Sequence, residues 1–246
     1  MLMNTKEEIN RDGFAVVENI FTSSEINNLL SVISQADTAK PAFRKSTDLF
    51  AIRQFLKEVP AVVAYVFNNK INALITQLFG KEYFAVKSIY FDKPENSNWF
   101  VAYHQDLTIS VDKKADLAGY GPWTVKQDQF AVQPPLNILE DNFTIRIHMD
   151  DTDEGNGALK VIPGSHLKGI YRAETIDWDI EKERICNVPA GGIMIMKPLL
   201  LHASGRSTSG NKRRVIHIEF SRSSLAADLN WAEKINLQYS NEEKIF

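Results

Sequence analysis

The chain has 246 residues, of which 44% are hydrophobic and 24% are charged, proportions typical of a globular protein. Its formal net charge is −3, without the basic excess of a nucleic-acid binder. No stretch reaches the roughly 18 apolar residues of a membrane span, and the acidic N-terminal residues do not resemble a signal peptide. The single cysteine, Cys186, excludes an internal disulfide framework. We therefore expect a cytoplasmic protein with neither nucleic acid nor membrane as partner, and its oligomeric state is unknown from sequence.

The first 80 residues are predicted to form helical support. A short strand is expected over residues 13–18, and Thr22 and Glu25 then form a capping-box pattern. One face of the helix that follows is apolar and consists of Ile26, Leu29, Leu30 and Ile33. A second apolar stripe predicts a helix over 60–79, which Gly80 would end.

After Gly80 the pattern changes to short β-like runs separated by turns, which is typical of an antiparallel sandwich or barrel. The expected strands span 84–91, 99–103, 143–149, 158–162, 185–188, 193–196 and 215–220. Turn residues at 154–157 predict a hairpin between 143–149 and 158–162. Residues 107–142 lack periodicity, and such a long segment is usually functional, so we interpret it as a lid.

No repeat or linker interrupts the chain, and a single domain over 1–246 is therefore expected. Its helical support would span about 20–80 and its β core about 84–222.

The triplet His104-Gln105-Asp106 is the first candidate for chemistry. Residues i and i+2 of a strand point to the same face, so the imidazole and the carboxylate can bind two adjacent positions of one metal ion. The triplet alone is unspecific, because a polar strand end with an ion pair would look the same.

A histidine from a distant strand would complete a three-ligand site. The available histidines are His148, His166, His202 and His217. We favour His202, because it follows an apolar run and precedes Ala203-Ser204-Gly205, where a strand ends and a side chain can reach inward. His217 is interpreted as a strand histidine, and His166 as a cap of the turn after Pro163-Gly164.

Two histidines and one carboxylate suit Fe(II) and leave three open positions on one face of the metal. A 2-oxo acid would take two of these positions and dioxygen the third. A zinc-dependent hydrolase can use the same ligand set, and a metal-binding jelly-roll protein without oxygenase activity is a further alternative.

The basic cluster Lys212-Arg213-Arg214 supports the oxygenase interpretation. An arginine binds a carboxylate through two parallel hydrogen bonds, as the far end of a 2-oxo diacid would require. Arg213 lies eleven residues after His202 and begins a predicted strand. Arg213 and Arg214 would point to opposite faces, so one of them can point inward.

The chain resembles the phytanoyl-CoA dioxygenase family of Fe(II)/2-oxoglutarate oxygenases from about residue 10 to residue 222. The motifs that carry the resemblance are Phe91-Asp-Lys-Pro94 with Asn98-Trp99, His104-Gln-Asp106, Asn156-Gly-Ala-Leu159, Ile162-Pro-Gly-Ser-His166, and His202-Ala-Ser-Gly205 followed by Arg213.

This resemblance implies a mainly β fold with flanking helices around a double-stranded β-helix, the jelly-roll or cupin-like core. It also implies iron ligands at His104, Asp106 and His202, with 2-oxoglutarate as co-substrate, O2 as oxidant, and Arg213 or, in reserve, Arg214 as the anchor. Related halogenating enzymes have a small residue in place of the carboxylate ligand, so the presence of Asp106 favours hydroxylation or another oxidation over halogenation. We expect the reaction to hydroxylate an unactivated carbon of a small-molecule metabolite.

Four further residues are candidates for contact with the substrate. Arg146 and His148 alternate with apolar residues and would face the barrel interior, near 2-oxoglutarate or the substrate, unless they form a salt bridge with Asp150 or Asp151. Lys93 precedes the first ligand strand, and Trp123 lies in the predicted lid. The identity of the substrate is not readable from the sequence.

Overall fold

The computed structural model describes residues 2–36, 42–46, 50–95, 97–126, 129–226 and 228–237. Its α-helices are α1 (Leu2–Asp12), α2 (Ser23–Ser34), α3 (Phe55–Glu58), α4 (Val63–Val66), α5 (Asn69–Leu78) and α6 (Leu136–Asp141). Short 3-10 turns are η1 (Pro60–Val62), η2 (Glu154–Asn156), η3 (Ser165–Lys168) and η4 (Ala173–Thr175).

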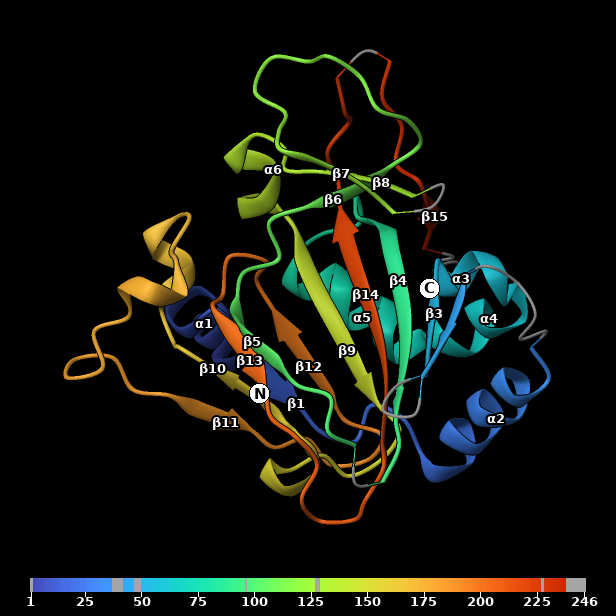
Figure 1. Ribbon diagram of the computed structural model, residues 1–246. Helices are drawn as coiled ribbons and strands as arrows, with labels where there is room; N and C mark the ends of the chain where they lie inside the picture. The colour runs from blue at the N-terminus through green and yellow to red at the C-terminus, as the bar shows by residue number, and fades with distance from the viewer. Residues whose placement is uncertain are drawn as a thin grey trace.

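Antiparallel strands form the rest of the regular structure (Figure 1). They are β1 (Phe14–Val17), β2 (Phe43–Lys45), β3 (Phe50–Arg53), β4 (Phe84–Lys93), β5 (Val101–His104), β6 (Ile109–Val111), β7 (Trp123–Lys126), β8 (Gln129–Val132), β9 (Phe143–His148), β10 (Leu159–Val161), β11 (Arg184–Cys186), β12 (Ile193–Met196), β13 (His202–Ser204), β14 (Arg213–Ser221) and β15 (Ile235–Asn236).

The strands form two main sheets and a small third one. The large sheet has the order β1-β12-β9-β14-β4-β3-β2, with β15 added beside β4. The second sheet has the order β11-β10-β13-β5, and the third has the order β6-β8-β7. Successive strands of the chain alternate between the two main sheets over much of the β region, so residues distant in sequence become neighbours.

The large sheet has a helix-covered face and a face turned toward the second sheet (Figure 1). Strand β9 shows the consequence, because all six of its residues are buried. Phe143, Ile145 and Ile147 belong to the apolar core shared with helices α2 to α5. Since side chains alternate along a strand, Arg146 and His148 point the other way, toward the interior between the sheets.

The expected helix over 60–79 is wrong as a single element. The chain forms η1, α4 and α5 instead, with a break at Phe67 and Asn68. The Asn68 side chain accepts a hydrogen bond from the backbone N–H of Ile71 at 3.0 Å. Asparagine competes well for such N-cap positions, so a new helix begins where the apolar stripe alone predicts continuity.

The hairpin expected between 143–149 and 158–162 is also wrong. Strand β9 pairs with β12 and β14, whereas β10 pairs with β11 and β13. Between them, the Asp153 side chain accepts from the backbone N–H of Asn156, and the Asn156 side-chain oxygen accepts from the backbone N–H of Asp153. This capped turn carries the chain from one sheet to the other.

The segment from 107 to 142 contains regular structure that its sequence does not suggest. Its described residues form β6, β7, β8 and α6, and an apolar cluster joins them to Val86, Leu199 and Trp231. None of these described residues lines the cavity discussed below.

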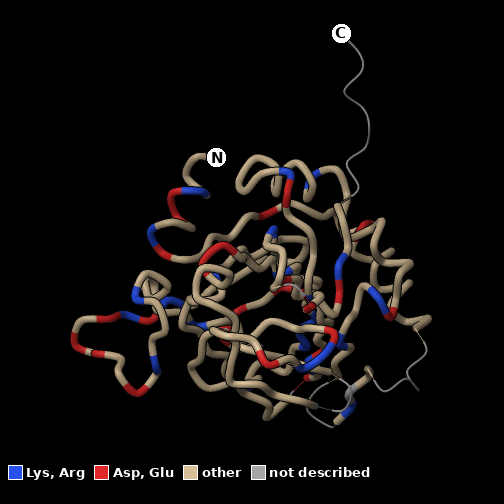
Figure 2. The backbone as a smooth tube through the Cα atoms, turned by 90° about the horizontal axis from the view of Figure 1, so that it is seen from above, with Lys and Arg blue, Asp and Glu red and all other residues tan. Residues whose placement is uncertain are grey.

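No helix in the described ranges is both long and apolar enough to cross a membrane. Acidic and basic residues are interspersed along the described backbone (Figure 2), in keeping with the net charge of −3.

Candidate active site

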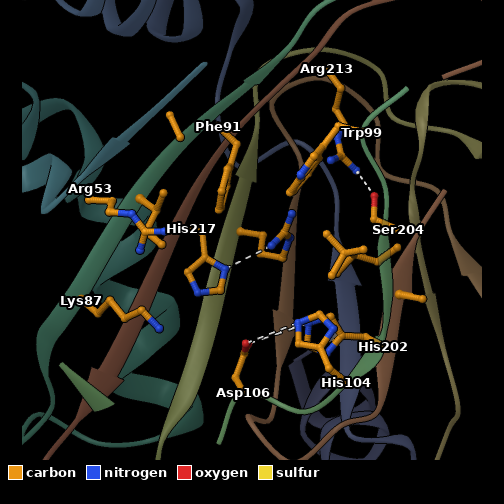
Figure 3. Close-up of a pocket in the computed structure, with 16 residues that line it drawn as sticks. Arg53, Lys87, Phe91, Trp99, His104, Asp106, His202, Ser204, Arg213 and His217 are labelled. Carbon is orange, nitrogen blue, oxygen red and sulfur yellow. Dashed lines mark hydrogen bonds and ion pairs between the residues drawn. The ribbon is translucent and has the colours of Figure 1, made fainter. Parts of the chain in front are cut away.

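Three side chains that could bind a metal ion meet at one end of the second sheet. His104 ends β5, His202 begins β13, and these two residues lie opposite each other in the antiparallel pairing. Asp106 follows β5, and its backbone N–H donates to the Pro198 carbonyl at 2.9 Å. The carboxylate oxygens of Asp106 lie 3.9 Å from Nε2 of each histidine (Figure 3). One ligand atom from each residue therefore fits around a common point.

Backbone carbonyls determine which nitrogen of each imidazole faces that point. His104 Nδ1 lies 2.8 Å from the Ala102 carbonyl, and His202 Nδ1 lies 2.9 Å from the Leu200 carbonyl. A carbonyl oxygen can only accept, so each Nδ1 carries the proton and each Nε2 directs a lone pair at Asp106. This is the orientation in which histidines bind metal ions.

The protonation states fit a divalent cation. Burial lowers the pKa of His202 to about 4, so its imidazole is neutral at pH 7. Burial opposes ionisation of Asp106, but His202, His217 and Lys87 together lower its pKa. Asp106 Oδ2 is buried and has no hydrogen-bond partner among the described residues. A buried, charged oxygen without a donor is costly, and a metal ion would satisfy it.

Gln105, which lies between His104 and Asp106 in the sequence, holds the end of β5 in place. Its amide nitrogen donates to the Leu199 carbonyl at 2.5 Å and to the Gly169 carbonyl at 2.9 Å. Its amide oxygen accepts from the backbone N–H of Tyr171 at 2.8 Å. Because Gln105 faces away from its neighbours along the chain, it anchors the segment while His104 and Asp106 face the cavity.

A cavity of about 470 Å³ opens between the two main sheets beside these three residues, a size typical of small-molecule sites. It is lined by Ala51, Arg53, Lys87, Ile89, Phe91, Trp99, Val101, His104, Asp106, Arg146, Leu159, His202, Ala203, Ser204, Arg213 and His217. The apolar and aromatic members can exclude water, and the polar members can orient a ligand.

Arg213 and Arg214 point to opposite faces of β14 and have different partners. Arg213 lines the cavity and is buried, and it donates to the Gly157 carbonyl and to Ser204 Oγ, the latter at 3.3 Å. Its Nε has no partner among the described residues. Arg214 instead donates to Asp150, from Nε at 2.9 Å and from the terminal nitrogen at 2.6 Å. Arg213 is therefore the one that can bind an anion in the cavity.

Lys93 lies directly opposite Arg213 in the pairing of β4 with β14. It is 1% exposed, and its Nζ donates to the Gly205 carbonyl at 2.6 Å. Burial and the Arg213 guanidinium lower the pKa of Lys93 to about 8. Lys93 does not itself line the cavity, but it adds positive charge behind Arg213.

Arg146 and His148 both face the interior, but the salt bridge considered for them with Asp150 or Asp151 is wrong. Arg146 lines the cavity and shares a 3.1 Å hydrogen bond with Nδ1 of His217. His148 bonds Thr152 Oγ1 at 2.8 Å, and its Nε2 has no partner in the described part of the chain. Burial and the nearby guanidiniums lower the pKa of His148 well below its usual value, so it is neutral.

Two other sequence predictions lie elsewhere in the molecule. Trp123 is on β7, packs against the apolar cluster of the third sheet and does not line the cavity. His166 lies near α1, where its Nε2 is 3.2 Å from the Asn10 carbonyl.

A second polar group, which the sequence patterns did not predict, lies at the cavity wall. Lys87 Nζ contacts Glu219 at 2.6 Å, and Glu219 lies 3.2 Å from Nε2 of His217. Arg53, from β3, lines the same wall. Charged residues within otherwise apolar strands were the available signal, since Lys87 alternates with Val86 and Ser88 on β4.

Solved structures share this fold. The carbocyclase SnoK from nogalamycin biosynthesis matches 89% of this chain and 83% of its own, with a TM-score of 0.67 and 14% identity. EctD from S. alaskensis, solved with 2-oxoglutarate and 5-hydroxyectoine, matches 89% of this chain and 75% of its own, with a TM-score of 0.65 and 17% identity. The jelly-roll fold class predicted from sequence is thereby confirmed.

HygX from Streptomyces hygroscopicus, solved with nickel, 2-oxoglutarate and hygromycin B, matches 89% of this chain and 86% of its own. Its TM-score is 0.63 and its identity is 14%. Among curated proteins, a phytanoyl-CoA dioxygenase domain-containing protein 1 homolog from Caenorhabditis elegans is 23% identical over 95% of this chain and 96% of its own length.

A family model for phytanoyl-CoA dioxygenase matches residues 9–215, a range that includes all three donor residues and Arg213. The chain therefore belongs to the phytanoyl-CoA dioxygenase family, oxygenases that use Fe(II), 2-oxoglutarate and O2.

Proposed function

We propose that this oxygenase hydroxylates an unactivated carbon of a small-molecule metabolite. His104, Asp106 and His202 would hold the iron, and Arg213 would anchor 2-oxoglutarate. The observation that carries the proposal is the convergence of two imidazole lone pairs and an unpartnered carboxylate oxygen beside a buried guanidinium.

When bound, the iron supplies redox chemistry with O2, while 2-oxoglutarate is oxidatively decarboxylated to succinate and carbon dioxide. The protein's own contribution is to place the reactants and to exclude water. Asp106 occupies the position that must be small for chloride to bind in a halogenase, which supports hydroxylation or another oxidation over halogenation.

Arg213 is suited to the distal carboxylate of 2-oxoglutarate. Its guanidinium is buried, points into the cavity and has no carboxylate partner among the described residues. A planar fork binds a carboxylate through two parallel bonds, and Ser204 Oγ, 3.3 Å from the guanidinium, can add a third contact. Burial lowers the pKa of Arg213, but an arginine remains charged at pH 7.

Of the substrate candidates from the sequence, Arg146 is proposed as a further contact to 2-oxoglutarate or the substrate, and His148 and Lys93 as residues that support the cavity from behind. Arg146 fits this role best because it lines the cavity. It also interacts electrostatically with both neighbours of the site: the Asp106 carboxylate raises the pKa of Arg146, and Arg146 lowers the pKa of Arg213. His148 and Lys93 stand behind the cavity wall, where they can orient Arg213 and its surroundings. The small molecules bound in the HygX and EctD structures support a small-molecule substrate.

The ligand assignment is tested by metal binding and by 2-oxoglutarate turnover. Wild-type protein should bind Ni(II) or Fe(II) and produce succinate, and His104→Ala or Asp106→Ala should lower metal affinity more than about 100-fold, since even residues behind ligands contribute 10- to 100-fold. His166→Ala, which removes a histidine near α1, is the matched control. Full activity in Asp106→Ala would refute the ligand set.

The same assay separates the alternative functions. A hydrolase would be active with Zn(II) and produce no succinate, and a binding protein would take up metal without any turnover across a panel of candidate substrates.

A further inference from the structure

We propose that His217 is a positioning residue, which holds the Arg146 guanidinium at the metal end of the cavity so that it binds the 2-oxo-carboxylate end of the co-substrate. Arg213 then has only the far carboxylate to bind. This inference rests on the proposed function, and it divides the recognition of 2-oxoglutarate between two arginines.

His217 lies at the metal end of the cavity. One of its ring nitrogens, a carboxylate oxygen of Asp106 and one of Glu219 all lie within 4.8 Å of one another. Arg213 belongs to the same strand, β14, four residues before His217, which is roughly 13 Å along an extended chain. Figure 3 shows the consequence, with His217 near Asp106 and Arg213 at the opposite end of the cavity.

Strand pairing places Arg146 beside His217. The two residues lie directly opposite each other in the register of β9 with β14, both line the cavity, and each is 6% exposed. Burial lowers the pKa of Arg146 to about 10, against the opposing effect of the Asp106 carboxylate. Burial lowers the pKa of His202, and Arg146 adds to this effect. The guanidinium therefore lies within electrostatic reach of two residues of the metal site.

Hydrogen bonds fix the tautomer of His217. Its Nδ1 lies 3.1 Å from a terminal nitrogen of Arg146, and an arginine can only donate, so Nδ1 accepts. The proton of the ring is therefore on Nε2, which donates to Glu219 Oε1 at 3.2 Å. The same oxygen accepts from Lys87 Nζ at 2.6 Å. His217 thus links Arg146 to a buried ion pair on the neighbouring strand.

The same bonds make His217 unsuited to bind a metal ion, although it lies near Asp106 and Glu219. Both ring nitrogens are in use, Nδ1 as an acceptor and Nε2 as a donor. The two histidines assigned to the metal have the reverse tautomer, with Nδ1 bonded to a backbone carbonyl and Nε2 free of its proton. His217 can therefore act on the site only through Arg146.

His217 can orient Arg146 because its own ring is held on several sides. Phe91 packs edge-on against the imidazole, with centroids 6.4 Å apart and an interplanar angle of 85°, and Glu219 holds Nε2. His217 occupies one terminal nitrogen of Arg146, and the Arg146 Nε has no partner among the described residues. The rest of the guanidinium remains for an anion, to which its hydrogen bonds would be charge-assisted.

The test compares two probes that share the 2-oxo-carboxylate group. 2-Oxoglutarate has a second carboxylate, and 2-oxopentanoate has a methyl group in its place. Calorimetry on the full chain loaded with Ni(II) gives the dissociation constant of 2-oxoglutarate, and competition against it gives that of 2-oxopentanoate. His217→Leu should weaken both probes about tenfold, because it removes the acceptor that holds Arg146. Arg213→Lys should weaken 2-oxoglutarate alone.

Two results with these probes would overturn the proposal. If His217→Leu weakened 2-oxoglutarate alone, Arg146 would belong with the far carboxylate. If 2-oxopentanoate did not compete even in the wild-type protein, the metal end would not be the site of recognition.

Two amide substitutions separate positioning from packing. The side-chain oxygen in His217→Asn can take the place of Nδ1 and accept from Arg146, whereas the longer side chain in His217→Gln can donate to Glu219 in place of Nε2. We expect His217→Asn to bind both probes within about threefold of wild type, and His217→Gln to be as weak as His217→Leu. Equal losses in the two amide variants would indicate a structural role and overturn the proposal, even if His217→Leu does not fold.

A double substitution tests whether His217 acts through Arg146. In an Arg146→Met background, His217→Leu should cause no further loss of affinity for either probe, because the two residues act as one unit. Additive losses would contradict this. His166→Leu, which removes a histidine near α1, is the matched control and should leave both dissociation constants unchanged.

Metal binding separates this inference from the proposed function. Wild-type protein that binds neither Ni(II) nor 2-oxoglutarate would contradict the proposed function. Intact binding of both, with His217→Leu indistinguishable from His166→Leu, would overturn the inference alone. We expect His217→Leu to keep the Ni(II) affinity and stoichiometry of the wild type, and loss of a bound ion in this variant would make His217 a ligand and also overturn the inference.

Discussion

Two adjacent arginines differ in environment because a strand presents alternate faces. Arg213 is buried in the cavity wall, whereas Arg214 forms a two-bond ion pair with Asp150. The sequence alone does not say which of the two arginines points into the cavity. The register of β14 against β4 and β9 decides it.

Arg213→Lys should therefore weaken 2-oxoglutarate binding about tenfold or more, because an ammonium cannot make two parallel bonds to a carboxylate. Calorimetry on the Ni(II)-loaded protein gives the dissociation constant. Arg214→Gln is the control and should leave that constant unchanged while lowering stability. Equal effects of the two substitutions on 2-oxoglutarate binding would contradict the assignment of Arg213.

Lys93 should make stability depend on pH. Its pKa is about 8 when folded, against its usual 10.5. Above pH 8 the folded protein has lost this proton while the unfolded chain still holds it, so stability rises with pH up to about 10.5. We expect a gain of about 1–3 kcal/mol across this range.

Urea denaturation at several pH values from 7.5 to 10.5 measures that gain. The same measurements on Lys93→Met give the pH dependence that all other groups contribute, so the difference between the two proteins belongs to Lys93. If the free energy of unfolding changed with pH equally in both proteins, Lys93 would not carry the effect.

At the scale of elements, the turn from η2 into β10 is shaped around the cationic residues. Gly157 has a φ of +85°, and a Cβ there would lie 2.7 Å from both the Gly205 carbonyl oxygen and Lys93 Nζ. The Gly157 carbonyl accepts from Arg213. A glycine is required here for backbone conformation and for close approach, and the turn thereby supports the arginine.

Gly157→Ala should lower the free energy of unfolding by more than about 1 kcal/mol, from the left-handed backbone and the close contacts combined. Gly205→Ala is a matched control, because a Cβ at Gly205 meets no atom within 4 Å. Chemical denaturation compares the two, and similar losses would argue against this role of the turn.

The pairing of elements explains the errors of sequence analysis. The 143–149 and 158–162 strands are near in sequence and separated by turn residues, yet each finds its partners far along the chain. Hydrophobic alternation identifies strands, but it does not say which strands are adjacent. The same limit applies to 107–142, where short strands stabilise one another and become recognisable only once packed.

At the scale of the whole molecule, the two sheets hold like charges together. Arg213, Arg146 and Lys93 are all buried, and their mutual repulsion lowers the pKa values of Arg213 and Lys93 beyond the effect of burial. Folding alone brings these charges together, so ligands that neutralise them should stabilise the folded state strongly.

Ni(II) with 2-oxoglutarate at 100 times its dissociation constant should add about 2.7 kcal/mol. For a chain of this size that corresponds to a rise in Tm of about 5–11 °C. Thermal denaturation followed by circular dichroism measures it, and a chelator should reverse it. Asp106→Ala should show little or no rise, and a full rise in that variant would contradict binding at this site.

The sequence by itself determined the elements and the chemistry that depend on near neighbours. The Thr22–Glu25 cap and most strands follow from spacing, because backbone geometry within a few residues is local. His104 and Asp106 do reach a common point, although β5 ends at His104 and Asp106 lies beyond the strand. The ordered motifs also indicated the family, which the family model confirms.

Only the tertiary structure decided which distant side chains meet. In the folded chain His202 lies opposite His104, and Arg213 points into the cavity. Arg53 and Lys87 line the same cavity, whereas Trp123 lies outside it. The physical reason is that strand pairing and register are set by packing of the whole chain, and a shift of one residue would point each of these side chains to the opposite face.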